Sequence, residues 1–208
     1  MKIIVFGATG TLGRIIVEQA LNNGHAVTAF TRTGQFNHAN HPALDVVQGD
    51  VLDAAAVSYA LSGHDAAICA LGAGRKGGLR AAGTRHILAG MKEHGIRRFV
   101  CLSSLGVGDS AGNLNFFWKN IMFGLLLRPA YADHGIQETI VRNSELDWTI
   151  VRPAAFTDGP KTGAYKHGFS GKTQEGLQLK ISRADAAEFM LAQLNSNMYL
   201  HHAPGVSY

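Results

Sequence analysis

The segment GATGTLG at residues 7–13 limits the possible folds more than any other part of this chain. It follows the apolar run at residues 3–6, which has the length and composition of a strand buried on both faces. It precedes residues 12–22, where Leu12, Ile16 and Ala20 recur at helical spacing. The glycine spacing alone is a weak signal, but between a strand and a helix it predicts the phosphate-binding turn of a βαβ unit.

Each glycine of this turn has its own predicted role. Gly7 permits the tight turn, Gly10 lets the backbone approach a pyrophosphate, and Gly13 lets the helix pack closely on the strand. The first N–H groups of the helix carry a partial positive charge that favours phosphate. We therefore expect a dinucleotide here, the alternative being a tight turn without a ligand. The residues assigned to this contact are Gly7, Thr9, Gly10, Thr11, Leu12 and Gly13.

The end of the second predicted strand indicates which dinucleotide is bound. Enzymes that prefer NAD place an acidic residue there to accept a hydrogen bond from the ribose 2′-hydroxyl. Here that position holds Arg32, which would attract a 2′-phosphate, and Arg14 just beyond the glycine turn can assist it. We expect NADP(H) as the cofactor. The alternative for both arginines is a solvated surface charge.

Other residues at predicted strand ends are assigned to the rest of the cofactor. Asp50 and Val51 are expected at the adenine, although Asp50 can equally cap a turn. The small residues after the fourth strand, from Leu71 and Gly72 onward, would let the ribose and nicotinamide lie against backbone. Ser103 and Ser104 end the fifth strand, where a hydroxyl can orient the carboxamide or the substrate, or simply satisfy a turn.

The remaining chain continues the alternation of strands and helices. Further strands are predicted at residues 26–31, 44–48, 65–71, 98–102, 147–151 and 178–181, and helices at residues 53–61, 80–94, 133–143 and 183–194. This alternation predicts an α/β fold: a single Rossmann-type domain over residues 1–208, with a doubly wound, mostly parallel sheet and helices on both faces. Residues 103–132 and 152–177 are expected to be substrate-side loops, because both follow strand ends where open α/β sheets bind ligands.

Composition excludes several classes of protein. Only 16% of the residues are charged and the net charge is +4, without the dense basic stretch that a nucleic-acid partner requires. The two cysteines, Cys69 and Cys101, lie in apolar runs and suit a core rather than a disulfide framework or a zinc site. His201-His202 lacks further ligands nearby, so no metal is expected. No secretory signal and no run of about 20 apolar residues is present, so we expect a cytoplasmic protein without a membrane span.

Several of these segments together resemble the atypical short-chain dehydrogenase/reductases. They are the glycine turn, GDVL at residues 49–52, Ser103-Ser104, DWTIVRP at residues 147–153 and DGPKTGAY at residues 158–165. The chain is most similar to the NmrA-like branch, which contains biliverdin reductase B, also called flavin reductase. The similarity spans nearly the whole chain and is most particular at residues 158–165. It implies a monomeric-type Rossmann domain that binds NADPH, with Pro153 at the cofactor, and that reduces flavins or linear tetrapyrroles by hydride transfer.

Departures from the family bear on the chemistry. Alcohol-oxidising members use a tyrosine with a lysine four residues later for acid–base work, and no tyrosine here has that partner. In the flavin reductase branch a serine sits where Ser104 falls, and this residue is carried over as the catalytic candidate. A histidine of that branch falls near Ala155 and is not carried over. His134 matches a family histidine, but a single histidine on a helix favours a structural role.

The apolar stretch at residues 115–127 is longer than the corresponding loop of that branch. Its aromatics, Trp118 among them, can form a lid that stacks on a planar substrate. Phe156 and Tyr165, from the other long loop, are assigned to the opposite wall. The alternatives for residues 116–127 are core packing, a dimer interface or a membrane-surface role.

The sequence leads to two functional hypotheses. The first is an NADPH-dependent reductase of a flavin-like, tetrapyrrole or other planar conjugated acceptor, acting as a monomer or weak homodimer. The second is an NmrA-like redox sensor that binds NADP(H) without turnover and acts through a partner protein. An isomerase or epimerase of nucleotide-linked sugars is disfavoured, because those relatives keep the tyrosine–lysine pair and have a larger substrate domain.

Overall fold

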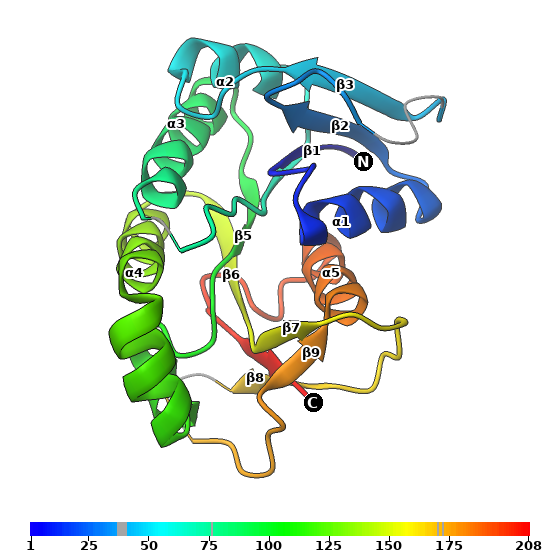
Figure 1. The fold of residues 1–208 in the computed structure, drawn as a ribbon. Helices are drawn as coiled ribbons and strands as arrows, with labels where there is room; N and C mark the ends of the chain where they lie inside the picture. The colour runs from blue at the N-terminus through cyan, green and yellow to red at the C-terminus, as the bar shows by residue number, and fades with distance from the viewer. Residues whose placement is uncertain (37–40, 76, 170, 172) are drawn as a thin grey trace.

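The computed structural model describes residues 1–36, 41–75, 77–169, 171 and 173–208. Within these residues, eight strands form one sheet in the order β3-β2-β1-β4-β5-β6-β10-β8, and β7 and β9 form a separate pair (Figure 1). The strands of the sheet are β1 Lys2–Phe6, β2 Ala26–Thr31, β3 Leu44–Gln48, β4 Ala66–Cys69, β5 Arg98–Leu102, β6 Asp147–Pro153, β8 Lys166–Phe169 and β10 Gly205–Ser207. The separate pair is β7 Ala155–Thr157 and β9 Lys180–Ser182.

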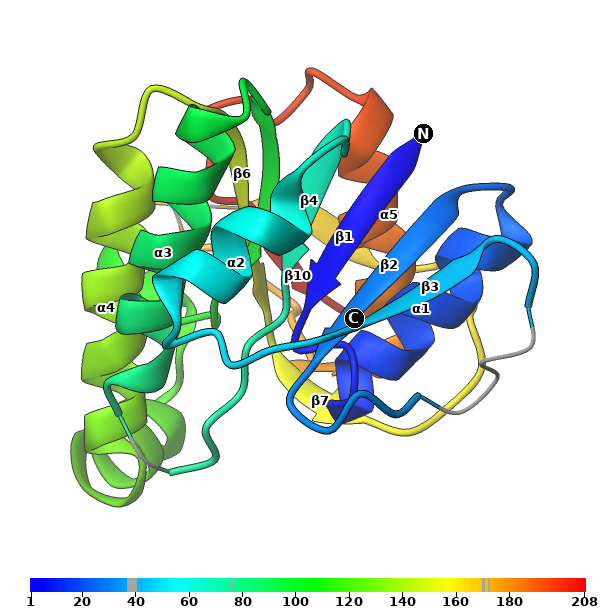
Figure 2. The same ribbon diagram turned by 90° about the horizontal axis from the view of Figure 1, so that it is seen from above.

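The helices cover both faces of this sheet. They are α1 Thr11–Asn22, α2 Ala54–Leu61, α3 Leu79–Glu93, α4 Arg128–Arg142 and α5 Arg183–Ala192, together with η1 Gly108–Asn113, η2 Phe117–Leu126 and η3 Gln193–Asn195. Seen from above, α1 and α5 lie on one side of the sheet, and α2, α3 and α4 lie on the other (Figure 2). The predicted α/β architecture with helices on both faces is therefore confirmed.

The side chains of β1 explain why both faces need helices. Successive residues of a strand point to opposite faces, and in β1 all four positions from 3 to 6 are apolar and fully buried. Ile3 and Val5 pack in the core shared with α1 and α5, while Ile4 and Phe6 pack in the core shared with α2 and α3. Cys69 and Cys101 lie in the second core as buried free thiols, as predicted from their apolar surroundings.

The order of the first six strands determines where a ligand can bind. The strands β3-β2-β1-β4-β5-β6 are all parallel, and the chain reverses its direction of winding between β1 and β4. Open parallel sheets bind ligands outside the carboxyl ends of the strands at this switch point. In this chain those ends carry the glycine turn after β1, Leu71 after β4 and Ser103 after β5.

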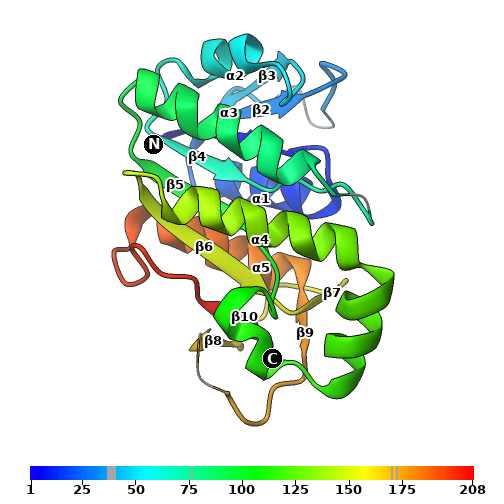
Figure 3. The same cartoon turned by 90° about the vertical axis from the view of Figure 1, so that its left-hand side faces the viewer.

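The two stretches expected to be loops contain more regular structure than predicted. Residues 103–132 hold η1, η2 and the first turn of α4, which begins at Arg128 rather than at the predicted Asp133. Residues 152–177 hold the end of β6, β7 and β8. Figure 3 shows η2 as the coil that continues α4 at the lower right. Only Lys119 and Asn120 are polar between residues 116 and 127, too few to reveal a helical period, which explains the missed helix.

The last predicted strand, residues 178–181, lies outside the main sheet. The corresponding element β9 pairs with β7, and the place beside β6 belongs to β10, which pairs in parallel with β6 and antiparallel with β8. The C-terminal tail thus supplies a sheet strand that the alternating pattern did not indicate. Among the described residues, no helix is long and apolar enough to span a membrane.

Candidate functional site

A cavity of about 670 Å³ opens at the carboxyl ends of the central strands. It extends from the end of β2 past the glycine turn to the ends of β5 and β6. Of the residues predicted to bind cofactor or substrate, those that line it are Gly7, Thr9, Gly10, Thr11, Leu12, Arg32, Asp50, Val51, Leu71, Gly72, Ser103, Ser104, Trp118, Pro153 and Phe156. The structure thus brings together residues that are distant in the sequence.

The glycine turn has the geometry that a pyrophosphate requires. Gly7 has a φ of +83°, a conformation that a side chain would strain. A Cβ on Gly13 would overlap the carbonyl oxygen of Gly7, so only glycine lets α1 begin this close to β1. Gly10 is the N-cap of α1 and offers no side chain to its first N–H groups. The open cradle and the uncapped helix end fit a bound phosphate.

The loops after β2 and β3 form the end of the cavity where the adenosine is predicted. Arg32 is exposed there, and its carbonyl accepts a hydrogen bond from Gln48 Nε2 at 3.2 Å. Asp50 Oδ1 accepts from the Leu52 backbone N–H at 2.9 Å, so this carboxylate also holds the turn before α2. Val51 is buried against α3, where a Cβ on Gly83 would lie 2.8 Å from its methyl group. These residues present one cation and one apolar side chain to a nucleotide.

Two adjacent serines at the end of β5 differ in their hydrogen bonds. Ser103 is buried, and its hydroxyl donates to Glu138 Oε1 at 2.7 Å. Ser104 is partly exposed in the cavity, and its hydroxyl donates to the Leu105 carbonyl at a longer 3.3 Å. The hydroxyl of Ser104 therefore exchanges partners more readily, which suits a group that meets a bound molecule.

A buried charge network lies behind these serines. Arg152, in β6, is fully buried and donates to Glu138 Oε1 and Oε2 at 2.8 and 2.6 Å and to Asp109 Oδ1 at 2.6 Å. Burial alone would lower the pKa of Arg152, but these two carboxylates outweigh it and the pKa is raised. The network ties β6, α4 and η1 to the serine turn. The sequence did not indicate it, because its members are distant along the chain.

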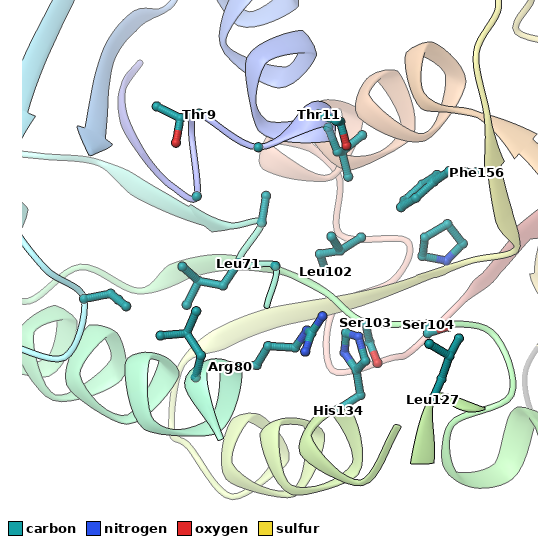
Figure 4. A pocket seen from close by; sticks show the side chains of 18 of the residues that line it. Thr9, Thr11, Leu71, Arg80, Leu102, Ser103, Ser104, Leu127, His134 and Phe156 are labelled. Carbon is teal, nitrogen blue, oxygen red and sulfur yellow. The ribbon is translucent and has the colours of Figure 1, made fainter. Parts of the chain in front are cut away.

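Two polar residues of the cavity were not assigned to it from the sequence. Figure 4 shows Arg80 and His134 directed toward Ser103 from α3 and α4. Arg80 Nη1 lies 3.5 Å from Asp133, whose carboxylate also accepts the backbone N–H groups of Arg80 and Ala81 and so holds the start of α3. His134, expected to be structural, lies in the cavity wall instead.

The imidazole of His134 is neutral at physiological pH. Burial is the largest cause and the positive charge of Arg80 adds to it, so the pKa of His134 falls to about 4. Its Nδ1 is buried and has no hydrogen-bond partner among the described residues. His134 can therefore exchange hydrogen bonds with a bound molecule, but it cannot act as a cationic acid near neutrality.

The far end of the cavity is apolar. Trp118, Met122 and Leu127 enclose it from η2 and the residue that follows. Leu105, Leu114, Ala154, Ala155, Phe156 and Leu179 complete this end. Among the described lining residues, the polar groups near this end belong to Arg80, Ser103, Ser104 and His134. Such a compartment suits a flat, uncharged ring system.

Three predicted site residues lie elsewhere. Gly13 packs α1 onto the turn, and Arg14 is exposed outside the cavity lining. Tyr165, predicted at the substrate wall, is absent from the lining and lies against α5. Its hydroxyl donates to Glu188, and its ring packs against Phe189 of α5. Burial, followed by the Glu188 carboxylate, raises the pKa of Tyr165.

Comparisons with known proteins agree with this geometry. Residues 7–197 match the model of a family described as NAD(P)H-binding. The chain is 30% identical to UPF0659 protein YMR090W of Saccharomyces cerevisiae, covering 93% of this chain and 87% of that protein. Some other curated relatives are longer, and the chain spans 61% of one and 20% of another.

Two solved structures share the fold. ChuY, an anaerobilin reductase from Escherichia coli O157:H7, superposes with a TM-score of 0.79 at 24% identity, covering 100% of this chain and 97% of that one. A short-chain dehydrogenase/reductase from Veillonella parvula, solved in complex with NADP, gives a TM-score of 0.81 at 16% identity, covering 100% and 94%. At these identities the likeness shows the fold.

Proposed function

The chain belongs to the NAD(P)H-binding family, and from this premise we propose that it is an NADPH-dependent reductase of a planar conjugated acceptor, such as a flavin or a linear tetrapyrrole. One observation carries the proposal: a single cavity joins a dinucleotide-type phosphate turn to an apolar compartment. A protein that only stored or sensed the cofactor would not need the second compartment. Because the phosphate turn and the apolar compartment belong to one cavity, a hydride can pass from a bound cofactor to a second bound molecule.

Arg32 supports NADPH rather than NADH. It takes the place of the acidic residue that accepts from the ribose 2′-hydroxyl in NAD-preferring proteins. A guanidinium offers no acceptor to that hydroxyl, but it forms charge-assisted hydrogen bonds with a phosphate. Gln48 holds the backbone of Arg32 at the rim of the cavity.

The bound cofactor would supply a hydride, and the residues of this chain would supply alignment. Ser104 would orient the carboxamide or the acceptor through its weakly held hydroxyl. Trp118 and Phe156 would stack on the acceptor and keep water from it. A flavin accepts hydride directly and takes its proton from solvent. A neutral His134 and the missing tyrosine–lysine pair are therefore compatible with such an acceptor.

The relatives support the choice of acceptor class. ChuY is an anaerobilin reductase, and anaerobilin reduction is tetrapyrrole chemistry. The resemblance of residues 158–165 to the biliverdin and flavin reductase branch points the same way. The single domain, the cytoplasmic location and the monomeric or weakly dimeric state stay predictions.

A redox sensor without turnover is the second candidate. The absence of the tyrosine–lysine pair favours it as much as it favours flavin reduction. A sensor would bind NADP⁺ and NADPH and leave every acceptor unreduced.

The deciding experiment measures NADPH binding and NADPH oxidation separately. The purified chain is titrated with NADPH and NADP⁺ by calorimetry and then mixed with NADPH and FMN, riboflavin, biliverdin or a water-soluble quinone. We expect binding of NADPH and oxidation with at least one acceptor. Ser104→Ala should lower kcat by about tenfold and leave NADPH binding nearly unchanged. Binding without oxidation of NADPH by any acceptor would reject the reductase in favour of the sensor.

A further inference from the structure

The exposed apolar side chains of this protein are concentrated at one place. Ten large hydrophobic residues are exposed in the part of the chain that the structure describes, and five of them lie within residues 116–126. These five, which we call the apolar face of η2, are Phe116, Phe117, Ile121, Leu125 and Leu126. Phe116 is 76% exposed and Leu125 is 73% exposed. Single exposed hydrophobics are ordinary, but a continuous group marks an interaction surface.

The same helix also forms a wall of the cavity. Trp118 and Met122 line the cavity, whereas their neighbours Phe117 and Ile121 are exposed. Both pairs are four residues apart, and a backbone bond from Leu127 N–H to the Met122 carbonyl, i to i+5, identifies the wide helical turn. Two adjacent apolar stripes therefore run along η2, one facing the cavity and one exposed at the surface. In Figures 1 and 3 this coil lies at the periphery, beyond the end of α4.

The stretch of sequence that contains the apolar face of η2 carries charges of one sign. No aspartate or glutamate occurs between Asp109 and Asp133, and this interval carries Lys119 and Arg128. Both of these cations are exposed. Asp109 pairs with Arg152, and Asp133 is buried against the start of α3. Among the described residues, neither Lys119 nor Arg128 forms an ion pair, so this surface combines exposed aromatic and aliphatic side chains with two unpaired cations.

We propose that the apolar face of η2 docks on an anionic lipid bilayer and that the acceptor is a lipophilic molecule which reaches the cavity from that bilayer. A helix with phenylalanine and leucine on one face and lysine or arginine beside them is suited to the headgroup–acyl boundary. The acceptor clause rests on the proposed reductase, whereas the docking clause does not. Because η2 contacts both the bilayer and the cavity, an apolar acceptor can pass from one to the other without crossing water.

A second copy of this chain fits the same surface less well. In a twofold-symmetric dimer the same patch of both copies meets. Lys119 and Arg128 would then face the same stretch of the other copy, and residues 110–132 contain no acidic residue to neutralise them. Charge complementarity favours an anionic partner.

The test measures binding of the full chain to vesicles by flotation. One set contains phosphatidylcholine alone and the other contains phosphatidylcholine with phosphatidylglycerol. We expect the chain to float with the anionic vesicles, with about tenfold less bound protein when the salt concentration is raised. Absence of binding to the anionic vesicles, or equal binding to both sets at low and high salt, would overturn the proposal.

Variants locate the surface and provide the control. Phe117→Glu combined with Leu125→Glu should reduce the bound fraction by about tenfold or more, and Lys119→Glu by about tenfold. Tyr59→Glu and Met198→Glu change equally exposed hydrophobics elsewhere, 81% and 70% exposed, and should bind like the parent. All variants are checked for unchanged NADPH affinity, which shows that they fold. Equal losses in η2 and control variants would overturn the assignment to η2.

Two further measurements separate the possible failures. Concentration-dependent self-association that the η2 double variant abolishes, in a chain that ignores vesicles, would replace the bilayer with a second copy. Oxidation of NADPH by a water-soluble acceptor without vesicle binding would overturn this proposal and leave the proposed function intact. Vesicle binding together with no faster oxidation of NADPH by a vesicle-dissolved quinone than by a water-soluble one would overturn the acceptor clause.

Discussion

At the scale of single residues, the glycine turn shows how sterics define a binding site. Only glycine fits at position 13, because a Cβ there would overlap the carbonyl oxygen of Gly7. Gly10, by contrast, leaves the N-terminal end of α1 without a capping side chain. The first constraint concerns packing and the second concerns ligand access. Both follow from the absence of a Cβ, which explains why a short motif predicted the turn so well.

Arg32 should determine the preference for NADPH over NADH. If Arg32 contacts the 2′-phosphate as proposed, Arg32→Asp would remove a charge-assisted hydrogen bond, worth about 1.5–3 kcal/mol, and would repel that phosphate. We expect NADPH affinity to fall on the order of a hundredfold while NADH affinity changes far less, as measured by calorimetry with both cofactors. Arg14→Asp is the matched control, because Arg14 lies outside the cavity lining. Equal losses for both cofactors would show that Arg32 does not contact the phosphate.

His134 should make stability depend on pH in a defined window. Its pKa is about 4 in the folded chain and about 6.5 when unfolded. Between these values the unfolded state binds more protons, so stability falls as the pH is lowered from about 6.5 to about 4.

His134→Asn should weaken that dependence by an amount on the order of 2 kcal/mol across the window. The measurement is urea unfolding of both proteins at several pH values. His25 and His64, whose pKa values are also lowered by burial, remain in both proteins and cancel in the comparison. Parallel stability curves would contradict a buried neutral imidazole at this position.

At the scale of elements, the segment DGPKTGAY at residues 158–165 illustrates a motif with a structural role. Asp185, fully buried in the first turn of α5, accepts from the backbone N–H groups of Thr162 and Gly163 at 2.7 and 2.9 Å. It also accepts from the Thr162 hydroxyl at 2.8 Å and the Tyr208 hydroxyl at 2.6 Å. The segment is thus fastened to α5, which explains why Tyr165 faces that helix and not the cavity.

Asp185→Asn should destabilise the protein by about 2–4 kcal/mol, because buried donors lose their charged acceptor. Chemical unfolding measures the loss of stability. Amide hydrogen exchange should accelerate first at residues 160–164. Asp158→Asn is the control, since the Asp158 carboxylate pairs with Arg183 at the exposed surface and should cost no more than about 1 kcal/mol. Similar effects of the two substitutions would refute the fastening role of Asp185.

At the scale of the whole molecule, β10 connects the C-terminal tail to the substrate side of the sheet. Gly205 of β10 lies beside Arg152 of β6 and Phe169 of β8. A Cβ at this position would overlap the ring of Phe169. Glycine is therefore required at position 205 for β10 to pair with both β6 and β8.

Gly205→Ala should destabilise the protein by about 1–3 kcal/mol through overpacking. Gly135→Ala makes the same chemical change inside α4, where nothing lies within 4 Å of the added Cβ. That control should stabilise the protein by about 0.5–1 kcal/mol through helix propensity. We expect the unfolding temperature Tm to fall for Gly205→Ala and to rise for Gly135→Ala. Shifts of the same sign would refute the packing argument.

The sequence by itself determined the architecture and the cofactor half of the site. Continuous apolar strands, helical spacing and the glycine turn are local patterns. They predicted the strands β1 to β6 and the doubly wound sheet. They also predicted most of the residues at strand ends, Gly7 and Ser104 among them, that meet in one cavity. Local patterns sufficed because the parallel sheet brings the carboxyl ends of its strands to one edge.

Only the tertiary structure decided the apolar end of the cavity and the residues that support it. The burial of His134 beside Arg80, the Glu138–Arg152–Asp109 network and the placing of Tyr165 against α5 depend on contacts between distant segments. No sequence spacing encodes these contacts, because each side chain gains its role from neighbours that folding supplies. The apolar stretch of η2 is the clearest case: its composition left core, interface and lid open, and the fold exposed one stripe while it turned the other into the cavity.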